Sequence, residues 1–158
     1  MSLQYVIDGY NIIKHPEFSP LHRKHTDARR ALVEFIREKK LCGSPKNKIT
    51  IVFDGYAPSG EGEDSSRQIE IIFSQARTAD EKIKNILEKT PFIKTTVVVS
   101  DDKEIKLFAR LTGAASLGVS EFISKAKKID RALLALKPEI TYSQMHKINE
   151  ELRKLWLK

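Results

Sequence analysis

Residues 5–8, Tyr-Val-Ile-Asp, form a short apolar run that ends in a carboxylate. The pattern returns three times along the chain. Ile-Val-Phe-Asp occupies residues 51–54, Val-Val-Val-Ser-Asp-Asp occupies 97–102, and the apolar run of residues 69–73 leads to Thr-Ala-Asp-Glu at 78–81. Short, continuously apolar runs are typical of strands covered on both faces, as in a parallel sheet. Because the carboxyl ends of parallel strands meet at one edge, we expect these acids to converge there.

The segments between the apolar runs have the spacing of amphipathic helices. One begins at Thr26 or Asp27, and Thr78 with Glu81 has the pattern of a capping box at the start of another. Pro16 and Pro20 predict an irregular stretch, and not an immediate helix, after the first strand. We expect strands at 4–8, 49–53, 69–73 and 95–100 with a short fifth at 114–117, and helices near 27–41, 78–90, 102–112, 119–136 and 142–157.

Strands that alternate with helices indicate an α/β fold with three layers, α/β/α, around a central, mainly parallel sheet of four or five strands. We expect a single domain over residues 1–158, with residues 138–158 forming a C-terminal helix that packs on it.

The composition and the net charge indicate the cellular compartment and the class of binding partner. The chain has one cysteine, no Cys/His spacing of a zinc site, and no apolar run near the roughly 20 residues that span a bilayer. These features predict a cytoplasmic protein without a membrane partner. The net charge is +7, although the acids are concentrated at the expected site. The remaining surface favours a polyanion such as nucleic acid, while a solvated basic surface without a specific partner is the alternative.

Several common chemistries lack their motifs. Asp8-Gly9-Tyr10-Asn11 follows the first strand where a dinucleotide site would need Gly-x-Gly-x-x-Gly. The chain has no Gly-Lys-Ser/Thr phosphate loop and no Gly-x-Ser-x-Gly, and Tyr10 occupies the position of the second Asp of an aspartyl phosphatase. Metal-assisted hydrolysis is the class that remains.

Converging carboxylates favour a hard divalent cation, Mg²⁺ or Mn²⁺, and two such ions can support phosphodiester cleavage. Asp8 and Asp54 each end an apolar run and precede glycine, whereas the other candidates lie in the first turns of expected helices, where acids also serve as caps. One acid of each pair there could bind the metal directly and the other through water or as a cap. Asn11 could orient the water or a phosphate. The candidate acids are Asp8, Asp54, Asp80, Glu81, Asp101 and Asp102.

Four segments resemble, in order and spacing, the motifs of bacterial NYN-domain proteins of the YacP-like group, within the PIN-like nuclease superfamily. They are residues 6–13, 52–54, 78–83 and 98–101. The resemblance spans residues 4 to about 125 and implies a Mg²⁺- or Mn²⁺-dependent endoribonuclease.

The resemblance also implies roles for individual residues. By matching position, Asp8, Asp80 and Asp101 are metal ligands, Asp54 is a fourth acid and Asn11 is a site residue. Two further acids depart from the pattern of the group. Glu81 stands where many relatives carry a second Asp, and Asp102 is an additional acid.

Basic residues near the expected acid edge are candidates for holding RNA, and aromatic residues there could stack on unpaired bases. The cations are Arg23, Lys24, Arg29, Arg30 and Lys103, and the aromatic residues are Tyr10, Phe18 and Tyr56. An RNA-binding or interaction module with little activity is the main alternative to the enzyme, and a DNA nuclease of the flap type is a third hypothesis. The RNA target, single-stranded mRNA or structured RNA, stays open, as do association with the ribosome and the oligomeric state.

Overall fold

The computed structural model describes residues 2–18, 27–57, 68–125 and 142–156. A sheet of five parallel strands forms its centre, in the order β3-β2-β1-β4-β5. The strands are β1 Gln4–Asp8, β2 Lys48–Phe53, β3 Ile69–Phe73, β4 Thr96–Val99 and β5 Ala115–Leu117. The predicted α/β class and parallel sheet are confirmed, including the short fifth strand.

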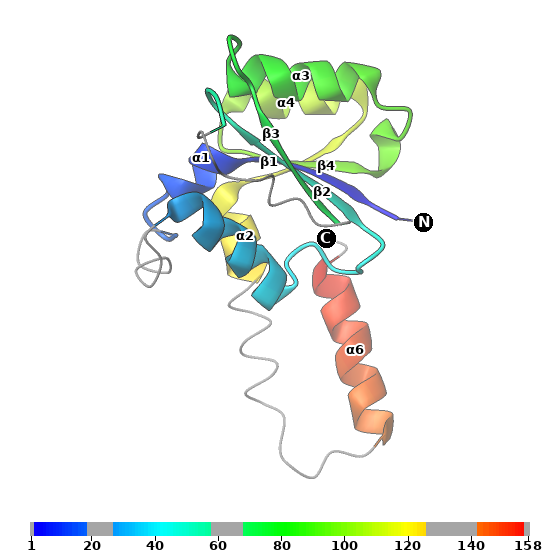
Figure 1. Cartoon of the computed structure of the whole chain (residues 1–158). Helices are drawn as coiled ribbons and strands as arrows, with labels where there is room; N and C mark the ends of the chain where they lie inside the picture. Colours follow the sequence, from blue (N-terminus) through cyan, green and yellow to red (C-terminus); the bar gives the residue numbers. More distant parts are fainter. Residues whose placement is uncertain (1, 19–26, 58–67, 126–141, 157–158) are drawn as a thin grey trace.

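Helices cover both faces of the sheet (Figure 1). Successive side chains of a strand point to opposite faces, and β1, β2 and β4 contribute to both apolar cores. In β1, Val6 packs with the helices of one face and Ile7 with those of the other. The first face carries α3 Ala79–Lys89 and α4 Lys103–Thr112, and the second carries α1 Gly9–Ile13, α2 Ala28–Lys39 and the helical residues 119–125.

Two helix starts agree with the sequence. Asp27 accepts a hydrogen bond from the backbone N–H of Arg29 at 2.9 Å and caps α2. Thr78 accepts one from the N–H of Glu81 at 3.2 Å and caps α3. These side chains satisfy amide groups that have no partner within the first turn of a helix.

The prediction of an irregular stretch directly after β1 was wrong, because α1 begins at Gly9. Pro16 follows the end of α1, so its ring cannot disturb the hydrogen bonds of that helix. Gly9 lies against the ring of Phe53, and a Cβ atom at this position would come within 3 Å of it. The absence of a side chain therefore lets the chain turn into α1 directly above β2.

Other element ends also differ from the prediction. The helix expected to reach residue 41 ends at Lys39, because Lys40 adopts a left-handed conformation with φ of 48°. β4 begins at Thr96, after a short 3₁₀ helix at Ile93–Thr95.

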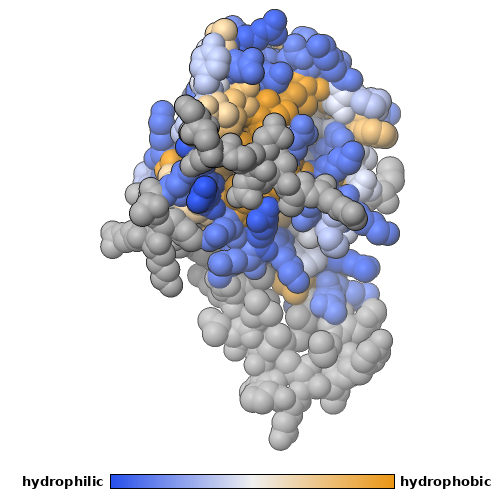
Figure 2. All heavy atoms as spheres, in the orientation of Figure 1, coloured by the Kyte–Doolittle hydropathy of each residue, from blue (hydrophilic) through white to orange (hydrophobic). Residues whose placement is uncertain are grey.

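The last helix, α6 Tyr142–Trp156, approaches the sheet with its C-terminal end (Figure 1). There the hydroxyl of Tyr5 donates to the carbonyl of Trp156 at 3.2 Å, and Leu152 is buried. The single domain and the packing of residues 138–158 stay predictions. None of the helices in the described part of the chain has the length and apolar character to cross a membrane. Figure 2 shows a face dominated by hydrophilic residues, with hydrophobic ones gathered toward the middle of the upper half.

Candidate active site at the carboxyl edge of the sheet

Four acids lie at the carboxyl edge of the sheet and influence one another electrostatically. Asp8 is the last residue of β1, Asp54 follows β2, Asp80 lies in the first turn of α3, and Asp102 is the N-cap of α4. We call these four residues the acid cluster. Alternation along the strands explains why Asp8 and Asp54 share a side, since the residues two positions earlier, Val6 and Val52, both pack against α3 and α4.

The pKa values show how the acid cluster is coupled. The pKa of Asp8, which is only 6% exposed, is raised from 3.8 to about 6. Burial is the main cause, and the charges of Asp80, Asp54 and Asp102 add to it, while the backbone N–H of Asn11 opposes it. The pKa of Asp80 is raised by burial and by Asp102 and Asp54. The fold thus holds carboxylates together at an electrostatic cost.

Two members of the acid cluster also support the backbone. Asp54 accepts a hydrogen bond from the N–H of Ala79 at 2.6 Å, which holds the first turn of α3 against the end of β2. Asp102 accepts bonds from the N–H groups of Glu104 at 2.8 Å and Ile105 at 3.1 Å. The capping interpretation therefore holds for Asp102. For Asp80 it does not, because Thr78 caps α3.

Asp8 also makes no side-chain cap bond, although it occupies the N-cap position of α1. Asp8 and Asp80 are therefore the members of the acid cluster with no helix-capping role. Both have a raised pKa. Bringing such groups together costs stability, and a site that uses them is the simplest reason to retain them.

Asp101 lies on the other side of the sheet edge from the acid cluster. Its carboxylate accepts a hydrogen bond from the N–H of Val119 at 2.9 Å, at the start of the helical residues 119–125, and lies 3.7 Å from Nε2 of His15. Asp101 is not among the charges that raise the pKa of Asp8. The two acids are neighbours at the sheet edge, but the structure directs their carboxylates to different surroundings.

Asn11 connects these two parts of the edge. Its side-chain oxygen accepts a hydrogen bond from the backbone N–H of Asp101 at 2.9 Å, so it ties α1 to the loop after β4. Glu81 is exposed on α3 and contributes to the pKa shift of neither Asp8 nor Asp80. The structure therefore brings Asn11 into the site and leaves Glu81 outside the acid cluster.

The predicted RNA-binding cations lie in different parts of the chain. Arg29 lies at the start of α2 with its guanidinium 5.7 Å from the centre of the Phe73 ring, at the end of β3. Arg30 and Lys103 are exposed in the first turns of α2 and α4. Arg23 and Lys24 lie outside the described residues.

The three aromatic candidates differ in exposure. Tyr56 is 68% exposed and so accessible to a base, whereas Phe18 is fully buried and packs against Phe35. Tyr10 is partly buried and packs edge-on against Phe53, with the ring centres 5.2 Å apart. Stacking of RNA on Phe18 is therefore a wrong prediction, because this side chain belongs to the core.

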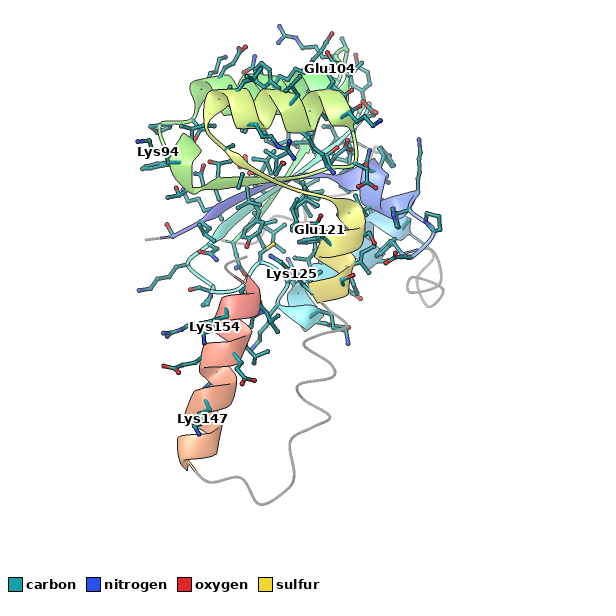
Figure 3. The ribbon with its side chains drawn as sticks, turned by 180° about the vertical axis from the view of Figure 1, so that it is seen from behind. Lys94, Glu104, Glu121, Lys125, Lys147 and Lys154 are labelled. Atoms are coloured by element: carbon teal, nitrogen blue, oxygen red, sulfur yellow. The ribbon has the colours of Figure 1, made fainter. Side chains whose placement is uncertain are left out.

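A link between α3 and α4 was missed in the sequence. Lys84 donates to Glu104 at 2.8 Å, and this bond is the main cause of the raised pKa of Lys84, to which Asp80 and Asp102 also contribute. Figure 3 shows Glu104 at the start of α4 near the carboxyl edge, with Lys94 at the opposite end of this layer. The sequence did contain one signal for the position of Lys84. Its four-residue spacing from Asp80 places both residues on one face of the helix.

The acid cluster suits a hard cation in its chemistry, since it offers carboxylate oxygens on rigid element ends. Among the residues that the structure describes, no three Asp, Glu, His or Cys side chains are close enough to hold an ion as they stand. Three carboxylates of the acid cluster would have to move closer together to hold one. The mutual repulsion that raises their pKa values is the force that a cation would cancel.

A parallel sheet between two layers of helices, with acids at its carboxyl edge, is the architecture of the PIN-like nucleases. Within this class the chain belongs to the family of the YacP-like NYN domain, whose model matches residues 5–157. The family resemblance inferred from the sequence is thus confirmed, and it extends beyond residue 125.

Two solved structures are similar to the chain. One is the crystal structure of a Trp-to-Leu mutant of Rae1 (YacP) from Bacillus subtilis, with a TM-score of 0.64, 21% identity and 98% of both chains covered. The other is a crystal structure of Rae1 (YacP) from the same organism, with a TM-score of 0.62, 23% identity, and coverage of 98% of this chain and 85% of that chain. At these identities the likeness shows the fold. No curated protein matches the chain.

Proposed function

We propose that this protein is a metal-dependent endoribonuclease that hydrolyses phosphodiester bonds of RNA at the acid cluster. The observation that carries the proposal is the position of Asp8, a buried carboxylate whose pKa is raised to about 6 by burial and by three further acids. A raised carboxylate pKa in a group of charged residues at a strand end indicates a functional site. Membership of a nuclease-like family and a net charge of +7 agree with an RNA substrate.

The proposed cation is Mg²⁺ or Mn²⁺, which carboxylate oxygens suit best. Asp8 and Asp80 would bind it directly, because the fold gives them no capping role. Asp54 and Asp102 would hold α3 and α4 in place through their backbone hydrogen bonds and add negative charge. When bound, such an ion lowers the pKa of water and neutralises charge on a phosphate. The role of Asp101 as a direct ligand stays a prediction.

The remaining residues of the edge would position the RNA. Arg29, at the start of α2, and Lys103, next to Asp102 at the start of α4, would supply positive charge for phosphates of the RNA at the carboxyl edge. Asn11 fixes the loop after β4 through the N–H of Asp101 and is a positioning residue. Exposed Tyr56, after β2, offers a surface for an unpaired base.

The test is cleavage of single-stranded RNA by purified protein in Mn²⁺ or Mg²⁺. We expect Asp8→Asn and Asp80→Asn each to lower the rate at least about a hundredfold, the loss typical when one group that stabilises the transition state is removed. Glu88→Gln, the same change at an exposed carboxylate near the end of α3, is the matched control and should retain the rate.

The outcomes separate the proposed enzyme from its alternatives. Equal cleavage by wild type and by both site variants would mean a contaminating nuclease and would refute the proposal. RNA binding without cleavage in either metal would favour an RNA-binding module instead. Cleavage of branched DNA in preference to RNA would identify a DNA nuclease.

A further inference from the structure

A cavity of about 350 Å³ lies at the amino edge of the sheet, away from the acid cluster. Its volume is within the range of small-ligand sites. The end of α2, the loop that follows it, the starts of β2 and β3 and the end of α6 enclose it. We call it the amino-edge cavity. The residues used below are Ile36, Ile49, Ile69 and Trp156 in the walls, and Arg37, Lys40 and Gln68 around them.

The walls of the amino-edge cavity are mostly apolar and fixed. Ile36, Ile49 and Ile69 come from three elements and are each buried. Trp156 is held by the hydrogen bond from Tyr5 to its carbonyl. It also packs against Gly43, where a Cβ atom would lie 3.4 Å from the Cβ of Trp156 and the backbone φ of +72° disfavours any other residue. These contacts hold the backbone and Cβ of Trp156 at the cavity wall.

Polar groups border this apolar space on one side. Arg37 and Lys40 are exposed residues that line the cavity, and neither forms an ion pair with an acid of the described chain. Gln68 donates its side-chain N–H to the carbonyl of Ser44 at 3.1 Å, so its side-chain oxygen still has acceptor capacity. An apolar slot bordered by two cations and an amide matches a planar ring that carries a phosphate.

Helix α2 runs from the carboxyl edge of the sheet to the amino-edge cavity. It starts beside α1 at the carboxyl edge and ends beside the cavity (Figure 1). Its 12 residues span about 18 Å. Basic residues occur at both of its ends, with Arg29 and Arg30 in the first turn and Arg37 and Lys40 at the end. A single strand bound at the acid cluster could cross the carboxyl edge of the sheet and follow α2 from its basic start to its basic end.

We propose that the amino-edge cavity binds one unpaired nucleotide of the RNA, with its base against the apolar wall and its phosphate at Arg37 and Lys40. This inference rests on the proposed function, because it names a second contact of the same RNA. It makes the amino edge an anchoring site, so that α2 holds the substrate while the acid cluster cleaves it elsewhere on the strand.

The chain carries its own reporter for this site. Trp156 is the single tryptophan of the sequence and lies in the cavity wall, so its fluorescence reports occupancy. The full-length chain with Asp8→Asn, which keeps the RNA intact, is titrated with a single-stranded RNA of about ten nucleotides, a length within the usual range of single-strand sites. Free N-acetyltryptophanamide corrects for absorption by the RNA. We expect a saturable change in fluorescence that follows binding measured by polarisation of a labelled RNA.

Two double variants in the same Asp8→Asn chain locate the contact. Arg37→Ala with Lys40→Ala should weaken binding at least about tenfold and reduce the slope of log affinity against log salt by about 0.7 for each lost phosphate contact. Lys89→Ala with Lys94→Ala removes the same charge from exposed positions in the layer on the other face of the sheet and should weaken binding by less than threefold.

Binding without any change in Trp156 fluorescence would overturn the proposal. Equal weakening by both double variants would also overturn it, because the cations would then act only through net charge. Cleavage by the chain with native Asp8 is measured separately. Cleavage without the fluorescence response refutes the cavity site alone, and a fluorescence response without cleavage refutes the proposed catalysis alone.

Discussion

Replacing Asp8 should stabilise the protein near neutral pH in the absence of divalent metal. The pKa of Asp8 is raised from 3.8 to about 6, and this difference corresponds to about 3 kcal/mol of cost for the charged carboxylate in the folded state. Asn has nearly the same shape as Asp and carries no charge. Allowing for burial of the new amide group, we expect Asp8→Asn to raise the free energy of unfolding by about 2 kcal/mol.

The sign of the effect depends on pH. The folded state holds the Asp8 proton more tightly than the unfolded chain, so the cost is absent below about pH 4 and grows as the pH rises to about 6. Above that pH the full cost is present. The advantage of Asp8→Asn should therefore be small at about pH 4 and complete at about pH 7.5. For a chain of 158 residues, about 2 kcal/mol raises Tm by roughly 4 to 8 °C.

The assay is thermal and urea unfolding in EDTA at both pH values, with Glu88→Gln as the control. The control changes an exposed carboxylate in the same way and should alter stability by less than about 0.5 kcal/mol. A variant that is less stable than wild type at both pH values, or equally stabilised at both, would refute the argument. Either result would mean that the Asp8 carboxylate carries no electrostatic cost in the folded protein.

Three further predictions concern the same edge of the sheet. Millimolar Mn²⁺ should raise the Tm of wild type but not of Asp8→Asn or Asp80→Asn. At an ion concentration of a hundred times Kd, the free energy of unfolding rises by about 2.7 kcal/mol. Equal shifts in all three proteins would place the ion elsewhere. Asp102→Ala should lower the free energy of unfolding by about 1 kcal/mol through loss of the α4 cap, while Asp102→Asn should be nearly neutral, and chemical denaturation distinguishes them. Gly9→Ala should cost about 2 kcal/mol or more, because the new Cβ would lie 2.6 and 2.9 Å from Cδ1 and Cζ of Phe53; an unchanged urea midpoint would contradict this packing.

The fold was largely predictable because apolar runs, caps and helix ends are local signals. In β1, β3 and β4 a short apolar run is followed by a helix, and α3 and α4 end within one residue of the predicted positions. The helix after β1 was not predicted, because Pro16 and Pro20 were expected to exclude a helix there. Pro16 constrains the residues just before it, whereas the close contact of Gly9 in α1 with Phe53 in β2 allows the turn into α1.

The division of the acids between two sides of the sheet edge required the strand register. β1 and β4 pair so that Ile7 lies opposite Val99, and both face the α2 side. Asp8 therefore corresponds to Ser100 in the alternation, and Asp101 projects to the opposite side. Alternation within each strand was readable from the sequence. The pairing that relates one strand to the other depends on contacts between segments about 90 residues apart, which a single sequence does not reveal.

The contacts near the acid cluster and near Asp101 also depend on the packing of segments that are distant in sequence. The bond from Lys84 to Glu104 and the approach of His15 to Asp101 each join different elements, so they depend on tertiary packing. The amino-edge cavity is still less local, because α2, two strands and α6 meet there. Sequence reasoning identified the residue types of the candidate site, and the structure determines which of them face each other.

The most direct test of the account is a crystal structure of the protein with Mn²⁺, using the anomalous scattering of manganese to locate the ion. We expect manganese density in contact with the carboxylates of Asp8 and Asp80. Manganese bound only at other acids, or no density at a concentration that supports cleavage, would contradict it.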